Sequence, residues 1–548
     1  MSEAFWSVDS LIVKNNAIFG FGWIFFARKE ITALHLKLTF RRANLFAPDY
    51  IMADVGKQRE DVERTFPGEP KALNSGYVVF GAFPAGAQLE SINLVCSLDD
   101  NSIIELTVPP SSVVGFFGCD EAEKNNLILR QSYVFFKRGL HLVRSGKFTS
   151  LFEKVQRYLR GRPKVALHKP SDLAAILRSD ERTRICLVID HDLGGGANHY
   201  RYRFVDSIVQ EGRTAIVLTF HVATLTHMLI LRNRRVNLRF SIPDKAFVID
   251  AVRFLSITDI VYNTAVSFVK PEEIPPLLIG LKRITSARLT ILVHDLFLIC
   301  PSHFLIDHAG VYCGIPDINV CTGCLQRNQQ GFANLFVARD IRKWRSIWGS
   351  TLAVSDEIVA FSKNTLDLLL EAYPKAAGLN LSVVPHRVNH LTGKIPNLTN
   401  IDRLCIGVVG QIGFHKGSLV VKALAQEIKR RNVDLKIVII GTIETNCEKS
   451  VVSQTGAYNY ERLPNLIERT GVNVMLFPSI WPETFSYVVQ ELMEMSLPIA
   501  SFNFGAPAER LTSYSRGLVL VSMNVESVLD ELILFHRKIY ITSGGLHA

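Results

Sequence analysis

The chain has 548 residues, of which 48% are apolar and 20% are charged, and its formal net charge is +10. This length predicts several domains rather than one. No apolar run reaches the roughly 20 residues of a membrane-spanning helix, and the first residues, MSEAFWSVDS, lack the basic segment of a secretory signal. We therefore expect a cytoplasmic protein whose positive charge suits anionic ligands or the inner face of a membrane.

Residues 1–117 contain short apolar runs that alternate with turn residues, such as ALHLKLTF, YVVFGAF and SINLVCSL. Short strands at this spacing, without a long helical pattern, are typical of an antiparallel β-sandwich. We expect an accessory domain here. The sequence leaves the role of this domain open.

Residues 118–181 form a basic segment that predicts one or two amphipathic helices, a connector between domains. Its basic residues are concentrated between positions 144 and 164, where a single acid, Glu153, accompanies Arg144, Lys147, Lys154, Arg157, Arg160, Arg162 and Lys164. Two interpretations are open. The segment is a solvated helix face, or it contacts a phospholipid surface as a peripheral membrane element.

Residues 182–398 change in texture, because Thr183–Ile189 is a continuous apolar run typical of a strand buried on both faces. A Gly-rich turn and a predicted helix from Asn198 to about Gln210 follow. Further strands are predicted at Thr214–Thr219, Asp259–Tyr262, Thr290–His294, Thr351–Val354 and Leu381–Val384. Alternating strands and helices predict a Rossmann-like domain with a parallel sheet.

Residues 399–548 repeat this alternation after a hinge-like stretch, Leu391–Asn400. Strands are predicted at Leu404–Val409, Leu435–Ile440, Val472–Phe477 and Leu497–Phe502, and helices at Gly417–Lys429, Phe485–Glu494 and Pro507–Leu511. The predicted fold class is therefore α/β, with two tandem Rossmann-like doubly wound domains. Such domains bind ligands at the carboxyl ends of their strands, so we expect a cleft between the two.

The segment Pro478–Arg510 holds the first motif, PSIWPETFSYVVQELME at its start. Free N–H groups and the helix dipole near Thr484 form a site for a diphosphate. Glu483 precedes the helix and Glu491 lies eight residues further on, a spacing that lets both carboxylates face one ligand with paired hydroxyls. The alternative is that Glu483 is an ordinary helix N-terminal carboxylate and Glu491 a surface residue.

The second motif is a loop after a strand, Gly410-Gln411-Ile-Gly-Phe-His-Lys416-Gly417. A Lys that follows a Gly-rich loop at a helix start is a phosphate-binding arrangement. The spacing differs from that of a P-loop. His415 offers a second cation, or it is a solvent-exposed loop residue.

These two motifs resemble those of the retaining family-four glycosyltransferases of the GT-B fold, in particular the subset that builds bacterial surface polysaccharides such as O-antigen and capsule. The resemblance covers about residues 183–520. It implies that Glu483 contacts the donor sugar, that Glu491 contacts the ribose, and that Thr484, Phe485 and Ser486 hold the diphosphate. Many members carry Arg where this chain has Gln411, so one phosphate-binding cation of the family is absent.

A third motif, Gly194-Gly195-Gly196, follows the first strand of the 182–398 domain. Consecutive glycines permit a close approach of the backbone to a ligand. The Gly-x-Gly-x-x-Gly pattern of dinucleotide sites is absent, which disfavours NAD. In the resembling family this loop faces the donor diphosphate, so Gly195 and Gly196 become donor-side candidates; a plain tight turn is the alternative.

A histidine and two polar residues follow predicted strands. His294 and Asp295 end one strand and Asn263 ends another. A strand-end His beside an acid can polarise a reacting oxygen, although an isolated His is also commonly structural. The resembling family has an active-site His at the equivalent place. We therefore expect His294 to be catalytic, and Asp295 and Asn263 to lie on the acceptor side.

Four cysteines cluster shortly after His294: Cys300, Cys313, Cys321 and Cys324. One Cys-x2-Cys pair with two upstream cysteines could complete a tetrahedral zinc site. Four thiolates leave no open coordination position, so such a zinc ion would be structural. Four reduced thiols in a loop are the alternative.

Together these features predict a retaining glycosyltransferase of the hexosyl or deoxyhexosyl type that transfers a sugar from a nucleotide-diphosphate sugar to a growing glycan or a lipid-linked oligosaccharide. His294, Glu483 and Lys416 are the predicted catalytic residues, and no metal or cofactor is required for catalysis. One alternative is a non-catalytic glycan-binding or scaffold protein on the same fold, which Gln411 favours. A zinc- and phosphate-binding nucleic-acid protein would explain the charge and the cysteines, but it leaves the two α/β domains and the Glu pair unexplained, so nucleic acid is not an expected partner.

Overall fold

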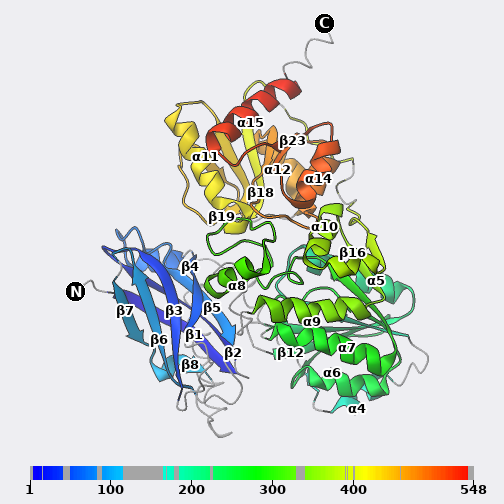
Figure 1. The fold of residues 1–548 in the computed structure, drawn as a ribbon. Helices are drawn as coiled ribbons and strands as arrows, with labels where there is room; N and C mark the ends of the chain where they lie inside the picture. The colour runs from blue at the N-terminus through cyan, green and yellow to red at the C-terminus, as the bar shows by residue number, and fades with distance from the viewer. Residues whose placement is uncertain are drawn as a thin grey trace. The chain divides into compact units, whose positions relative to one another are not determined.

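The computed structural model describes residues 4–14, 17–40, 50–57, 59–82, 89–100, 102–114, 165–167, 169–177, 184–221, 226–268, 270–328, 340–388, 391, 393–398, 401–456, 458 and 460–540 (Figure 1). Most of the predicted basic connector, with all of its concentrated charge, lies outside these residues. The chain divides into two compact units. The first comprises residues 1–194, 201–288 and 334–338, and the second comprises residues 195–200, 289–333 and 339–548.

The N-terminal part of the first unit is an eight-stranded sheet of order β7-β6-β3-β4-β5-β2-β1-β8. Its strands are β1 (Ala4–Lys14), β2 (Ala17–Phe26), β3 (Ile31–Phe40), β4 (Tyr50–Lys57), β5 (Gly76–Ala82), β6 (Leu89–Leu98), β7 (Ile103–Thr107) and β8 (Val113–Val114). All pairs are antiparallel except β1 with β8. Alternate residues of β3, namely Leu34, Leu36 and Leu38, enter one apolar core. The predicted short antiparallel strands are therefore present and surround a core.

The rest of the first unit contributes strands in the order β14-β10-β11-β12-β13-β9. The strands and helices are β9 (Val165–Ala166), α4 (Pro170–Leu177), β10 (Ile185–Ile189), β11 (Thr214–His221), β12 (Thr226–Arg232), β13 (Asn237–Ile242), α6 (Ala246–Ala251), β14 (Ile257–Tyr262) and α7 (Ile274–Thr285). Every side chain of β10 is buried, as its continuous apolar run predicts. Helix α5 (Gly196–Gln210) begins in the second unit and continues in the first.

The prediction of a parallel sheet is wrong at β12, which runs antiparallel to both of its neighbours, β11 and β13. Neither strand was predicted from the sequence. Only a few residues connect β11 to β12 and β12 to β13, and a parallel connection needs a crossover of a dozen or more residues. The short connections therefore force hairpins at this edge of the sheet.

The second unit begins with three parallel strands, β15 (Arg288–Val293), β16 (Glu357–Ala360) and β17 (Leu381–Val383). Helices α8 (Ile318–Arg327), α9 (Ile341–Val354) and α10 (Lys363–Ala372) accompany them. The predicted strand Thr351–Val354 is wrong, because these residues form the last turn of α9. Trp344, Trp348 and Leu352 recur every four residues and are buried, so the helical period prevails over a short apolar run.

A six-stranded parallel sheet of order β20-β19-β18-β21-β22-β23 follows in the second unit. Its elements are β18 (Cys405–Ile412), α11 (Ser418–Arg430), β19 (Lys436–Ile443), β20 (Val452–Gln454), α12 (Leu463–Thr470), β21 (Val474–Phe477), α13 (Tyr487–Glu494), β22 (Ile499–Phe502), α14 (Gly505–Ser513), β23 (Gly517–Leu520) and α15 (Val525–Tyr540). The predicted strands and helices of this region are confirmed, with ends shifted by a few residues. The strand order changes direction between β18 and β21, and α/β sheets bind ligands at the carboxyl ends of the strands at such a point.

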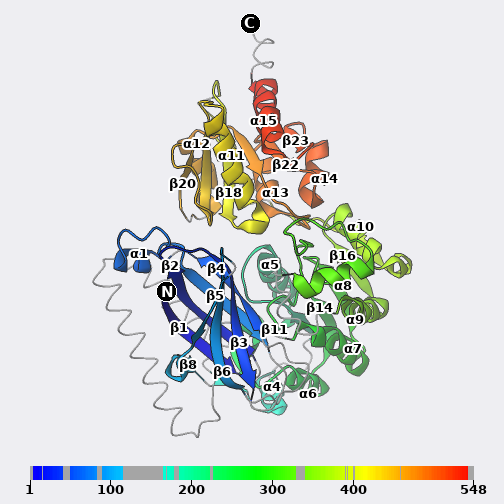
Figure 2. The same ribbon diagram turned by 60° about the vertical axis from the view of Figure 1, so that its left-hand side comes forward.

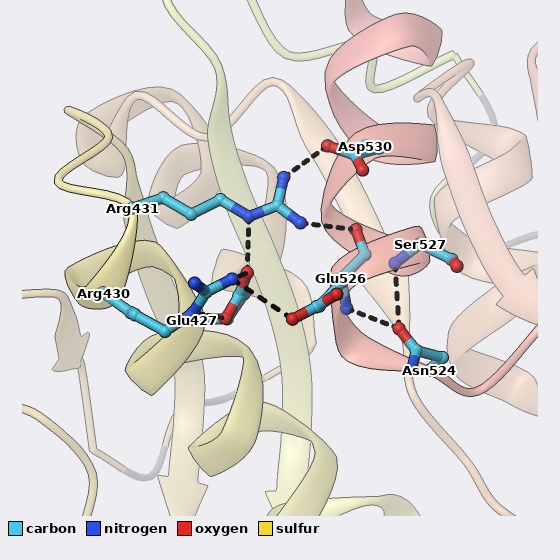
Figure 3. Close-up of polar contacts among 7 residues, drawn as sticks. All are labelled: Glu427, Arg430, Arg431, Asn524, Glu526, Ser527 and Asp530. Atoms are coloured by element: carbon cyan, nitrogen blue, oxygen red, sulfur yellow. Dashed lines mark hydrogen bonds and ion pairs between the residues drawn. The ribbon is translucent and has the colours of Figure 1, made fainter.

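Helices α11 and α15 pack side by side and are joined by an ionic network (Figures 2 and 3). Glu427 accepts two hydrogen bonds of 2.7 Å from Arg430 and a third from Arg431. Arg431 also pairs with Asp530 at 2.5 Å, and Arg430 pairs with Glu526 at 3.2 Å. These guanidinium groups lower the pKa of Glu427 to about 2. The network fastens α15 to α11.

None of the helices in the described part of the chain combines the length and the apolar character that crossing a bilayer requires.

Candidate functional site

Two loops meet at the carboxyl ends of β18 and β21. The amide of Ile480 donates to the carbonyl of His415 at 3.2 Å, and the hydroxyl of Ser479 lies 3.4 Å from that same carbonyl oxygen. Gly417 is required at this point, because it has a φ of +81° and a Cβ would lie 2.0 Å from the carbonyl oxygen of Pro478. The structure therefore brings the predicted Lys416 loop against the predicted Glu483 loop.

Lys416 stands at the start of α11, next to Gly417. Its side chain is half-buried, and its ammonium group has no ion-pair partner among the residues that the structure describes. The neighbouring His415 stacks on Phe304, with ring centroids 4.2 Å apart. Burial, helped by the charge of Lys416, lowers the pKa of His415 to about 4, so at neutral pH this imidazole carries no charge. His415 therefore does not supply the second cation considered from the sequence.

Glu483 lies 9% exposed at the end of the second loop. Its Oε1 atom is 3.4 Å from the hydroxyl of Ser479, and its backbone carbonyl accepts from the amide of Ala506 at 2.9 Å. Gly505 makes this approach possible, since a Cβ there would lie 2.6 Å from the carbonyl oxygen of Glu483. The carboxylate is thus held by both its side chain and its backbone, which suits a group that must contact a ligand in one orientation.

The turn at Phe485 and Ser486 connects this loop to α13. Ser486 has a φ of +63°, a sparsely populated conformation for a residue with a side chain, and its hydroxyl caps α13 by accepting from the amide of Val489 at 3.5 Å. Arg510 holds the turn, because it donates to the carbonyls of Phe485 and Ser486 and its guanidinium lies 4.4 Å from the centroid of the Phe485 ring. Burial lowers the pKa of Arg510 to about 10, so this side chain remains a cation at neutral pH.

His294 is tied to this turn through its backbone. The hydroxyl of Thr484 donates to the carbonyl of His294 at 2.6 Å. The hydroxyl of Thr365, at the start of α10, lies 3.3 Å from the carbonyl oxygen of Thr484. Residues far apart in the sequence, predicted from separate motifs, therefore meet at one place.

Six rings surround this place, and we refer to them as the ring cluster: Tyr200, His294, Phe361, His386, Phe485 and Tyr487. His294 stacks on Phe361 with ring centroids 4.2 Å apart, and Phe361 stacks on His386 at 4.0 Å. Tyr200 meets the His294 ring edge-to-face at 4.7 Å. Since these groups are closely packed aromatic rings, the imidazole of His294 is held in one orientation.

Glu491 lies on α13 and is 8% exposed. Burial raises the pKa of this carboxyl to about 7. It also contributes to the raised pKa of Tyr458, which shows that the two groups are close enough to interact. A carboxyl that titrates near neutral pH can both donate and accept hydrogen bonds, which matches the pattern of a ribose diol.

The glycines of two predicted ligand loops, residues 194–196 and 410–417, have backbone conformations or positions that disfavour other residues. Gly195 has a φ of +86°, and Gly410 has a φ of +120°. A Cβ on Gly196 would lie 2.9 Å from the ring of Tyr487, so the first turn of α5 contacts the start of α13. Gln411 is exposed at the end of β18.

Asn263 and Asp295 have structural partners. In the first unit, Asn263 is 1% exposed and donates to the carboxylate of Asp190 at 2.7 Å, while Arg201 pairs with the same carboxylate at 3.2 Å. In the second unit, Asp295 accepts from the amide of Phe297 at 3.0 Å and so stabilises the turn after β15. Their predicted role on the acceptor side stays a prediction.

The four cysteines of the predicted zinc site are free thiols. Among the His, Cys, Asp and Glu side chains that the structure describes, no group of three or more is placed to hold a metal ion. Burial raises the pKa of Cys300 to about 12 and that of Cys313 to about 11, which favours the protonated thiols. The side chains as placed do not fit a tetrahedral site, and zinc binding stays a prediction. Metal analysis tests it: less than about 0.2 zinc per chain would rule out a tight four-thiolate site.

Sequence reasoning missed several members of the site, namely His386, Phe361, Tyr200, Tyr487 and Arg510. His386 follows a strand, as His294 does, and the strand-end criterion that selected His294 would also have selected it. Arg510 closes the segment singled out in the sequence, yet a single Arg at a helix end carries no distinguishing signal. The remaining three are aromatic residues that look like ordinary core in the sequence.

Residues 394–538, which contain the Lys416 and Glu483 loops, match the family model described as Glycosyl transferases group 1. No curated protein sequence matches the chain significantly.

Among solved structures, sucrose-phosphate synthase from Thermosynechococcus elongatus is 13% identical, with a TM-score of 0.43 over 64% of this chain and 90% of that one. HepE from Anabaena, solved in complex with UDP and glucose, is 12% identical, with a TM-score of 0.40 over 64% and 89%. A glycosyltransferase from Rickettsia africae is 12% identical, with a TM-score of 0.43 over 66% and 89%.

Proposed function

We propose that this protein is a retaining glycosyltransferase of the GT-B fold that uses a nucleotide-diphosphate sugar. The observation that carries the proposal is the convergence of the Lys416 loop, the Glu483 loop and His294 on the carboxyl ends of the strands of the second unit. The match of residues 394–538 to a glycosyltransferase model supports it independently.

The residues divide the work as follows. The ammonium of Lys416 and the amides at the start of α13 would bind the diphosphate and stabilise the charge that develops as it departs. Glu483 would accept hydrogen bonds from hydroxyls of the donor sugar, and Glu491 would bind the ribose. Because Lys416 and helix-end amides neutralise the leaving group, we propose that no metal or cofactor is required.

His294 would act on the reacting centre. Its ring is fixed by Phe361 and Tyr200, and its backbone is fixed by Thr484. An imidazole held in this way can orient an acceptor hydroxyl or polarise a donor-sugar hydroxyl. We propose that transfer proceeds with net retention and with attack on the face that the diphosphate leaves. Within residues 478–510, the family resemblance assigns one carboxylate to the reacting sugar, that of Glu483.

We further propose that the acceptor is a growing glycan or a lipid-linked oligosaccharide in cell-surface polysaccharide synthesis, with the enzyme in the cytoplasm at the inner face of the membrane. The support is the likeness of the 478–510 segment to enzymes of that kind, together with the net charge of +10. Loss of liposome binding on neutralising Arg157, Arg160 and Arg162 is the expected result, and unchanged binding would contradict this localisation.

The first test is thermal stabilisation by a panel of nucleotide sugars that includes UDP-glucose, GDP-mannose and ADP-glucose. A ligand that binds only the folded state raises the melting temperature, so at least one member of the panel should do so. Release of nucleoside diphosphate and the anomeric configuration of the product, read by NMR, then test transfer and retention.

The second test is substitution. Glu483→Gln and Lys416→Ala should each lower turnover by about 100-fold or more, because each removes a group that acts on developing charge or on the donor sugar. Glu371→Gln and Lys375→Ala, both at exposed positions outside the site, are the matched controls and should leave turnover unchanged. Full turnover in both Glu483→Gln and Lys416→Ala would refute the assignment.

The alternative is a non-catalytic glycan-binding or scaffold protein on this fold. The specific observation that favours it is Gln411, which stands exposed where an Arg would bring a second cation to the phosphate. Binding of nucleotide sugars without any release of nucleoside diphosphate, in the presence of candidate acceptors, would support this alternative over the enzyme.

A further inference from the structure

Within the ring cluster, the His386 ring lies beside each of the other five rings. It is 9% exposed and lies three residues beyond the end of β17. Its ring centroid lies 4.0 Å from that of Phe361, 4.5 Å from that of Phe485 and between 5.1 and 5.3 Å from those of Tyr200, His294 and Tyr487. No sequence motif pointed to it.

The topology explains how His386 reaches this position. Strands β15, β16 and β17 are adjacent and parallel, so their carboxyl ends lie at one edge of the sheet. His294 follows β15, Phe361 follows β16, and His386 follows β17. Three consecutive strands thus present three rings side by side, and Phe361 stacks on both imidazoles.

His386 also contacts the start of α13. It meets the Phe485 ring edge-to-face and stacks on Tyr487 with an interplanar angle of 25°. Arg510 and Ser486 fix the same turn from the other side. His386 is therefore the common neighbour of the strand-end rings and of the turn assigned to the diphosphate.

We propose that His386 is a positioning residue for sugar transfer: its flat ring fixes the His294 imidazole relative to the Phe485–Tyr487 turn. This inference rests on the proposed function. The role belongs to the shape and stacking of the ring and needs no proton from it. A ring of the same shape without nitrogen atoms should therefore serve in its place.

Three variants of the full-length protein test the proposal. His386→Ala removes the ring, and His386→Phe keeps a flat ring of similar size but has no ring nitrogen. His536→Ala is the matched control, because it removes another buried histidine, 4% exposed, from helix α15 of the same unit. Melting temperatures identify any variant that fails to fold.

The kinetic readout is the kcat for hydrolysis of UDP-glucose, or of another nucleotide sugar from the panel if UDP-glucose is not bound. Loss of positioning near a reacting centre can cost up to about 100-fold in rate. We expect His386→Ala to lower kcat by about 10-fold or more and to leave the Kd for UDP within about threefold. His386→Phe should keep kcat within about threefold of the parent, and His536→Ala should lose melting temperature without losing kcat.

A second readout does not depend on turnover. In the NMR spectrum of histidine-labelled protein, the ring signals of His294 should shift in His386→Ala and stay near their original positions in His386→Phe, because neighbouring rings set these chemical shifts. If the parent protein hydrolyses no nucleotide sugar, the proposed function fails. Shifted His294 signals in His386→Ala would in that case still show that His386 positions the His294 ring.

Three outcomes would overturn the inference. If His386→Phe is as slow as His386→Ala, the ring nitrogens are needed and the role is chemical. If His386→Ala lowers the melting temperature but keeps kcat, the residue serves stability alone. Unchanged His294 signals in His386→Ala would show that the two imidazoles do not constrain each other.

Discussion

Glu427 on α11 and Glu491 on α13 belong to the same unit, and little of either side chain is exposed to solvent, 6% for Glu427 and 8% for Glu491. Their pKa values nevertheless move in opposite directions, to about 2 for Glu427 and to about 7 for Glu491. The difference lies in what surrounds each carboxylate. Arg430 and Arg431 both hydrogen-bond to Glu427, whereas burial dominates at Glu491.

This contrast distinguishes Glu427, a carboxylate that holds two helices together, from Glu491, whose burial in the charged form lowers the stability of the folded protein. Burial of a carboxylate disfavours its charged form, and guanidinium groups in contact with it reverse that effect. The α11–α15 network uses the reversal (Figure 3). Carboxyl groups whose pKa remains raised by burial are concentrated at functional sites, so the raised pKa of Glu491 agrees with its proposed role in ligand binding.

The largest expected effect comes from Glu491→Gln. Because its pKa is raised from 4.5 to about 7 in the folded state, the folded protein binds more protons than the unfolded protein over this interval, and stability falls as the pH rises through it. Glu491→Gln should therefore raise the free energy of unfolding at pH 8 by up to about 3 kcal/mol and change it little at pH 5. Thermal or urea unfolding at the two pH values measures this.

Glu494→Gln, at a half-buried position of the same helix, is the control. The gain at Glu491 also has a functional counterpart, since the amide should bind nucleoside diphosphates less tightly than the carboxyl. Equal stabilities of Glu491→Gln and the parent protein at pH 8 would refute the contrast between the two glutamates.

A second, smaller effect of opposite sign is expected from Glu427→Gln. The pKa of Glu427 is lowered in the folded state, so its contribution to stability is present above the ordinary value of 4.5 and is lost as the pH falls from there toward about 2. The variant should melt at a lower temperature than the parent at pH 7, and the gap should close as the pH is lowered below 4. Melting curves between pH 7 and pH 2.5 measure it; a gap independent of pH would contradict the ionic explanation.

The smallest effect distinguishes the two arginines of the network. The Arg431 side chain is 25% exposed and contacts Glu427, Asp530 and the backbone of Glu526, whereas the Arg430 side chain is 63% exposed. Arg431→Met should lower the melting temperature more than Arg430→Met, because exposed ion pairs contribute little and are screened by salt. In 1 M NaCl the loss in Arg430→Met should nearly disappear. A larger loss from Arg430→Met would overturn this order.

Features that depend on local interactions could be predicted from the sequence, whereas features that depend on contacts between distant segments could not. The six-stranded sheet was predictable, because continuous apolar runs such as those of β18 and β21 encode burial directly. The placement of Lys416 and Glu483 in loops that precede helices was also predictable, and their roles stay predictions. The segment Thr351–Val354 was wrongly predicted as a strand, because its buried residues belong to the helical face that also contains Trp344 and Trp348.

The association of the six rings in one cluster was not predictable from spacing. Its members come from the start of α5, from three strand ends and from the turn before α13, and each looks like an ordinary aromatic or strand-end residue in its own segment. Only the folded sheet edge shows that His386 and His294 face the same ring of Phe361. Contacts between distant segments carry no local pattern, and they decide the geometry of the site.

The hydrogen bond from Thr484 to the carbonyl of His294 spans 190 residues of chain. At a synthesis rate of about 5–20 residues per second, the ribosome adds Thr484 about 10 to 40 s after His294. During that interval the His294 segment lacks its later neighbours, first Phe361 and His386 and finally the 484–487 turn. The site is thus completed near the end of translation, and a nascent chain that stops before residue 484 lacks the turn that closes it.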